Sequence, residues 1–60
     1  MTIIAARDIP LGHQTVTEYD NGSGREEVVD AHGVLVTWCE IRKQDMPKWK
    51  AACQRVGMLR

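Results

Sequence analysis

The middle of the chain carries apolar and polar residues in the short-period pattern of β-strands. Residues 13–20 (HQTVTEYD) and 25–31 (REEVVDA) are rich in β-branched residues and are predicted strands. Residues 34–41 (VLVTWCEI) form the strongest predicted strand, with apolar side chains on two faces: Val34, Val36 and Trp38 on one, Leu35, Cys39 and Ile41 on the other. Because apolar residues on both faces are typical of a strand covered on both sides, this strand is expected to be the most buried.

Turn-forming residues separate these three segments. Residues 21–24 (NGSG) contain two glycines and an asparagine, which tolerate the positive φ angles of tight turns. Residues 30–33 (DAHG) place Asp first and Gly last, as in a type I turn followed by a left-handed glycine. Two tight connections in a row predict an antiparallel meander.

The C-terminal part changes to a helical period. Its apolar residues are spaced 3, 3, 1 and 3 positions apart, which places them on one face of a helix: Met46, Trp49, Ala52, Cys53 and Val56. Pro47 suits the first turn and Gly57 suits the position after the last, so the helix is expected at about residues 47–56. We expect Met46, Trp49, Cys53 and Val56 to pack against strand 34–41, with both tryptophans anchoring the core. The pattern leaves open which strand face they cover, the one with Val36 and Trp38 or the one with Leu35, Cys39 and Ile41. Met58 and Leu59 are candidates for an apolar contact after the Gly57 cap.

The first twelve residues are ambiguous. Ile3 and Ile4 favour a short strand, whereas residues 5–9 would also fit one helical turn that ends before Pro10. The expected fold is therefore a single α+β domain over residues 1–60. It has a three-stranded meander, four-stranded if residues 1–12 pair, followed by one C-terminal amphipathic α-helix packed on the sheet.

Length and composition limit what this domain can be. Sixty residues make one domain that buries only about 60% of its unfolded surface, so a partner, a metal or a second copy would add stability. No stretch of about 18 apolar residues is present, so no membrane association is expected. The short apolar run at residues 3–6 is not a secretory signal, which favours a cytoplasmic location with reduced cysteines.

Charge is distributed unevenly along the chain. Residues 1–40 hold two basic and seven acidic residues, and residues 41–60 hold six basic and one acidic, so net charges of −5 and +5 cancel. The candidate acidic face comprises Glu18, Asp20, Glu26, Glu27, Asp30 and Glu40, and the candidate basic face comprises Arg42, Lys43, Lys48, Lys50 and Arg55. The two halves either neutralise each other internally or form a binding surface of two signs.

Metal and disulfide sites are disfavoured by spacing and compartment. The four soft-metal ligands are His13, His32, Cys39 and Cys53, and 18, 6 and 13 residues separate them, whereas structural zinc sites use close pairs. No cofactor is expected. A Cys39–Cys53 disulfide is geometrically allowed between strand and helix, but we expect both cysteines to be small buried hydrophobes.

Enzyme activity is not expected. Neither His13 nor His32 lies in a recognisable catalytic motif, and the chain has no phosphate-binding or nucleophile-elbow pattern. Glu26 and Glu27 are adjacent on a strand, so their carboxylates face opposite sides and cannot act as one pair.

Three classes of function remain. The layout is similar to that of small DNA-binding domains such as integrase arm-binding domains, but acidic strands would be repelled by phosphate, which leaves the basic helix as the alternative contact for DNA or RNA. We favour a non-enzymatic protein that docks on a larger protein or nucleoprotein. Small phage and mobile-element inhibitors of host or defence complexes are of this kind, and the chain resembles them in size alone. Self-association into a homodimer is the third class, with an exposed apolar strip at Trp38, Val36 or Ile9 as its signature.

Overall fold

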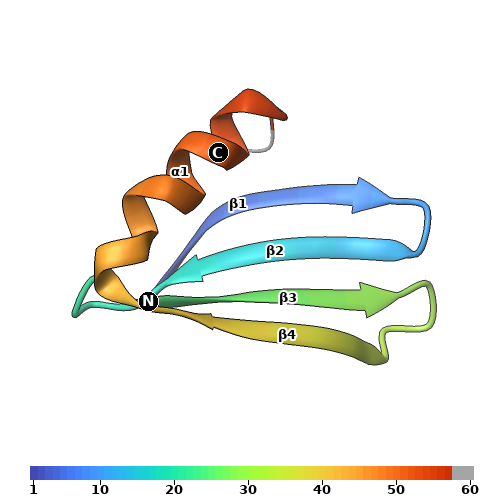
Figure 1. Cartoon of the computed structure of the whole chain (residues 1–60). Helices are drawn as coiled ribbons and strands as arrows, with labels where there is room; N and C mark the ends of the chain where they lie inside the picture. Colours follow the sequence, from blue (N-terminus) through green and yellow to red (C-terminus); the bar gives the residue numbers. More distant parts are fainter. Residues whose placement is uncertain (58–60) are drawn as a thin grey trace.

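A computed structural model of the chain describes residues 1–57. They form an antiparallel sheet whose strands are β1 (Thr2–Ile9), β2 (Gly12–Glu18), β3 (Gly24–Asp30) and β4 (Leu35–Ile41), in the spatial order β1-β2-β3-β4 (Figure 1). A 3-10 turn, η1 (Lys43–Asp45), leads into the helix α1 (Met46–Arg55). The predicted α+β meander with a C-terminal helix is confirmed, and the ambiguous first segment is a full edge strand.

The turn chemistry read from the sequence fixes the connections. Between β2 and β3, Gly22 has a φ of +91° and the Asn21 side chain accepts hydrogen bonds from the backbone and hydroxyl of Ser23. Between β3 and β4, Gly33 has a φ of +81°, and the Asp30 carboxylate accepts the backbone N–H groups of His32 and Val34 at 2.8 and 3.0 Å. Both hairpins are therefore held by the residues that predicted them.

The helix begins and ends one residue earlier than its expected range of 47–56. Pro47 lies in its first turn, and the Gly57 N–H bonds to the Gln54 carbonyl at 3.1 Å with a φ of +72°, which ends the helix as expected for a glycine cap. The proposed contacts of Met58 and Leu59 lie outside the described residues.

The core lies between α1 and one face of the sheet. Its buried residues are Ala5, Val16, Ile41, Met46 and Cys53, with Ile4 and Trp49 partly buried against them. Ala5 and Val16 are cross-strand neighbours with no exposed surface. The absence of a side chain at Gly24 lets Met46 pack closely on β3, because a Cβ there would overlap the Thr17 carbonyl oxygen and the Met46 methyl group. The helix thus covers mainly the β1–β2 half of the sheet (Figure 1).

The prediction that residues 34–41 form the most buried strand is wrong. In β4 only Ile41 is buried, and Trp38 is 52% exposed. Val56 and Cys39 are also exposed, so neither they nor Trp38 join the expected core. The reason is that the core forms mainly over β1 and β2, and β4 contributes only Ile41 to it. The Trp38 side chain points to the side of the sheet away from α1, and Cys39 lies on the helix side but at the far edge of the sheet.

The expected alternation of β4 is also interrupted. The register steps from Val28–Thr37 to Val29–Leu35, which leaves Val36 as an extra residue in a β-bulge. Leu35 therefore shares a face with Val29 rather than with Cys39 and Ile41, because directly opposed residues point to the same side of a sheet. Within residues 1–57, the helices are too short and too polar to span a membrane.

Candidate functional site: the open face of the sheet

One face of the sheet, the open face, has no element of residues 1–57 packed on it. The cross-strand register places Ile3, Thr17, Arg25 and Glu40 in one row across all four strands, and Glu27 and Trp38 in the adjacent row. The opposite face, which carries Ala5, Val16 and Ile41, is covered by α1. The pleat of the strands therefore separates a packed side from an exposed side.

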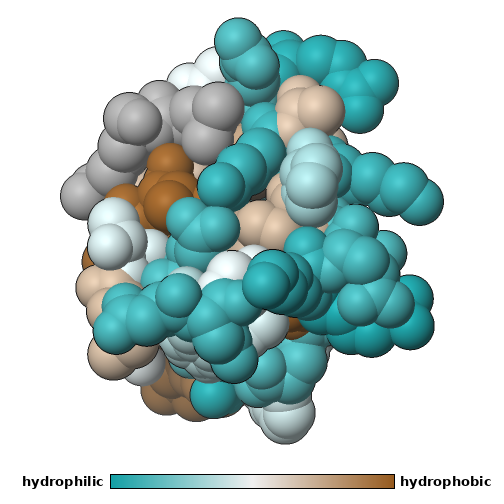
Figure 2. Space-filling view, turned by 90° about the vertical axis from the view of Figure 1, so that its left-hand side faces the viewer, coloured by the Kyte–Doolittle hydropathy of each residue, from teal (hydrophilic) through white to brown (hydrophobic). Residues whose placement is uncertain are grey.

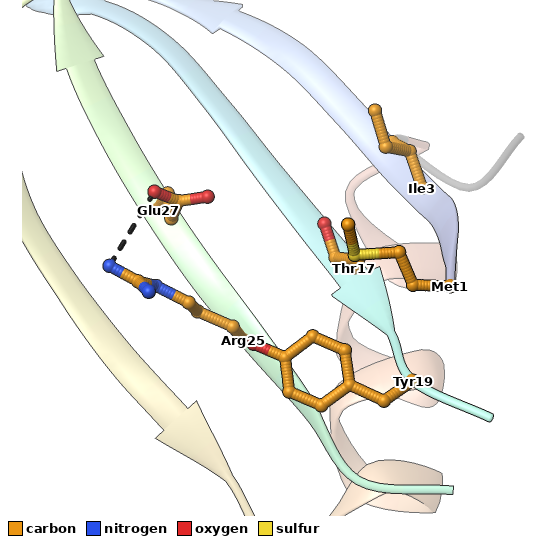
Figure 3. A pocket seen from close by; sticks show the side chains of 6 residues that line it. All are labelled: Met1, Ile3, Thr17, Tyr19, Arg25 and Glu27. Atoms are coloured by element: carbon orange, nitrogen blue, oxygen red, sulfur yellow. Dashed lines mark ion pairs between the residues drawn. The ribbon is translucent and has the colours of Figure 1, made fainter. Parts of the chain in front are cut away.

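A shallow hollow of about 450 Å³ lies on the open face. Its lining residues are Met1, Ile3, Thr17, Tyr19, Arg25 and Glu27, and Figure 3 shows their side chains on the side of the sheet away from α1. Strands form its floor, and the Tyr19 ring and the Arg25 side chain stand at one side of it. The hollow combines an aromatic ring, aliphatic side chains and one ion pair.

Arg25 links this hollow to β4. Its guanidinium carbon lies 4.5 Å from the centroid of the Trp38 ring, which is a cation–π contact. One terminal nitrogen is 3.7 Å from a Glu27 carboxylate oxygen, a long ion pair, and the buried Nε has no hydrogen-bond partner among the described residues. The stack orients the guanidinium while leaving part of its hydrogen-bonding capacity unused.

The six acidic candidate residues do not gather on one face. By register, Glu18, Glu26 and Asp30 lie on the helix side, Glu27 and Glu40 lie on the open face, and Asp20 lies in the β2–β3 turn. Glu18 pairs with Lys50 at 3.1 Å, and Glu26 accepts a hydrogen bond from Gln14 at 2.7 Å. Asp20 contacts the Met1 amino group at 3.1 Å.

The five basic candidate residues are also divided. Arg42 pairs with Asp45 at 2.9 Å and Lys50 pairs with Glu18, while the Lys43 side chain lies over Gly22. Lys48 and Arg55 are seven positions apart on the exposed side of α1. Figure 2 shows the end of the molecule that carries the β2–β3 turn: hydrophilic residues cover most of it, with the strongest apolar patches at its left side and smaller, weakly apolar areas between the hydrophilic ones. Much of the charge asymmetry is therefore compensated internally.

The cysteines and histidines occupy separate places. Cys53 is buried in the core, and this burial raises the pKa of its thiol, an effect that the Arg7 charge partly opposes. Cys39 is exposed on β4, and His13 lies 2.9 Å from Asp8 at the end of the β1–β2 hairpin. Within residues 1–57 both thiols are free, and no three His, Cys, Asp or Glu side chains gather as metal ligands.

Comparison with protein-family models, with curated proteins and with solved structures yields no match. The candidate site therefore stands on its geometry. The charge pattern of the sequence did not single out Ile3, Tyr19 or Arg25. For Arg25 the available signal was its alternation with Glu27 and Val29 along β3, and strand pairing places Arg25 opposite Thr17 and Glu27 opposite Trp38.

Proposed function

We propose that this protein is a non-enzymatic binding module that docks through its open face on a larger protein or nucleoprotein complex. The observation that carries the proposal is the cluster of Trp38, Arg25 and Tyr19 on a sheet face without cover from any described element. A cytoplasmic location and a role as inhibitor of a host or defence complex belong to the same proposal.

The composition of the open face supports a protein partner. Trp, Tyr and Arg are the residues most enriched among those that dominate binding energy at protein interfaces. Here the stack of Arg25 on Trp38 orients both side chains before a partner arrives, which reduces the entropy lost on binding. Ile3 is 47% exposed and adds apolar area beside the hollow.

The shape of the hollow favours a side chain of a partner over a free small molecule. Small-molecule sites are concave and bury most of the ligand, whereas this hollow lies on the surface of a single sheet (Figure 3). A partner that inserts an apolar side chain between Ile3 and Tyr19 would bring its own oxygen acceptors close to Arg25. Glu27 and Glu40 would form the polar rim of that contact.

The test is capture of partners from extract of the native host, followed by identification by mass spectrometry and measurement of affinity. Tyr19→Ser and Arg25→Gln change the open face, and Lys48→Gln changes the outer side of α1 as the matched control. We expect each open-face variant to weaken binding at least about tenfold, as for an interface hot spot, and the control to bind like wild type.

Two results would overturn this assignment. One is a partner held equally well by both open-face variants. The other is retention of DNA or RNA, but no protein, that falls steeply with salt and is lost in Lys48→Gln, since that is the behaviour of phosphate contacts from the basic helix.

A further inference from the structure

The outer edge of β4 is apolar and unpaired within residues 1–57. Val34, Leu35, Val36 and Trp38 are 60, 42, 50 and 52% exposed, and no described strand follows β4 in the sheet. The strand is nevertheless fixed at both ends, by the Asp30 turn and by buried Ile41. Its free N–H and C=O groups are therefore presented in a fixed row to which another strand could add.

The opposite edge of the same sheet is protected. In β1, Arg7 and Asp8 are exposed charges, a bulge lies between Ile3 and Ala5, and Pro10 follows the strand. These are the usual devices that prevent edge-to-edge pairing. From Leu35 to Cys39, β4 has the bulge at Val36 but neither charge nor proline. Only one of the two edges is thus open to another strand.

We propose that β4 pairs antiparallel with β4 of a second copy of this chain, about a two-fold axis at Trp38. In this register Trp38 faces Trp38 of the other copy, Thr37 faces Cys39, and Val36 faces Glu40. The Trp38–Trp38 and Thr37–Cys39 pairs use the regular part of the strand, and the Val36–Glu40 pair lies at the bulge.

Charge selects this arrangement over a parallel one. Glu40 is the one charged residue of β4, and parallel pairing in register would place the two Glu40 carboxylates side by side. The antiparallel pair instead separates them by four residues, about 14 Å along the strands. Each carboxylate then lies beside the aliphatic Val36 of the other copy, and like charges are not opposed.

The result is a continuous sheet of two copies, with the two open faces on the same side. Aromatic side chains that are directly opposite each other across two strands stabilise the pairing, and the two Arg25–Trp38 stacks would flank the axis. A seam of one strand per copy is narrower than a standard interface of about 1,600 Å², so we expect weak association, between about 10 µM and about 1 mM. This dimer does not depend on the docking partner proposed above.

The first experiment is sedimentation equilibrium across that concentration range. Wild type is expected to pass from monomer to dimer, and Val36→Lys, which places a charge on the exposed edge, is expected to stay monomeric. Ile3→Lys is the matched control, because it makes the same kind of change at a similarly exposed position on β1 (47% against 50%), and it should dimerise normally. A wild type that is monomeric at about 1 mM would overturn the proposal.

The second experiment tests the register by oxidation in the concentrated state. Thr37→Cys should yield a covalent dimer in which the introduced thiol is joined to Cys39 of the other copy, since these positions face each other across the axis. Val36→Cys should not, because Val36 faces Glu40. Wild type cross-linked through Cys39 alone would overturn the Trp38-centred register. The two proposals can be tested separately. Tyr19→Ser should lose the docking partner and keep the dimer, whereas Val36→Lys should lose the dimer and keep the docking partner.

Discussion

The two cysteines, Cys39 and Cys53, have the same side chain but differ in burial. Both lie on the helix side of the sheet, but Cys53 is inside the core while Cys39 lies beyond the end of the helix cover. Sequence reasoning treated both as small buried hydrophobes and was right for Cys53 alone. An apolar side chain indicates only that a residue can be buried. Whether it is buried depends on which part of the sheet α1 covers.

The thiols should therefore differ in reactivity. With a limiting alkylating reagent at neutral pH, we expect Cys39 to be modified first, because it is exposed while burial both shields Cys53 and raises its pKa. Peptide mass spectrometry of the folded protein measures both rates. Equal rates in the folded state would contradict the burial of Cys53, and equal rates in denaturant provide the control.

Burial of Cys53 also predicts a pH dependence of stability. Because its pKa is higher in the folded than in the unfolded chain, the unfolded thiol loses its proton first as pH rises. The free energy of unfolding should be unaffected by this group below the unfolded pKa and should fall as pH rises from there to the folded pKa. Denaturant titrations of wild type and Cys53→Ala across the alkaline range test this, and parallel curves would contradict it.

Individual elements were predictable where their signals are local. Gly22, Gly33 and Asp30 fix the two hairpins through φ angles and short hydrogen bonds that residues within each turn supply. The bulge at Val36 was not predictable, because it is a property of the pairing between β3 and β4 rather than of either strand alone. That single extra residue moved Leu35 to the other face.

Gly24 tests how closely β3 packs against β2 and against Met46 at the start of α1. Gly24→Ala should lower the free energy of unfolding by about 2 kcal/mol, the range found for overpacking, since the added methyl overlaps Thr17 and Met46. Gly33→Asn is the control, because Asn tolerates positive φ and an added Cβ there meets no atom within 4 Å. Chemical denaturation measures both, and equal small effects would show that β3 does not approach Met46 closely.

In the whole molecule, the α+β class followed from two periods in the sequence, but the placement of the helix did not. A helix with one apolar face can lie over either half of a sheet, and here it lies over β1 and β2. The exposure of Cys39 follows from that placement, whereas the open face remains because α1 packs on one side of the sheet, and the β4 edge follows from the strand order. The charged residues were prominent in the sequence, yet pairs such as Lys50–Glu18 and Arg42–Asp45 neutralise several of them.

Amide hydrogen exchange, measured by NMR at low and high protein concentration, shows directly whether the β4 edge is open and whether a second copy covers it. In dilute protein, alternate amides of β4 should exchange fast because they point away from β3, while β2 and β3 amides stay protected. In concentrated protein the fast β4 amides should become protected, and those of the β1 edge should not. Protection of β4 already in dilute protein, or no change on concentration, would contradict an open edge that receives a second copy.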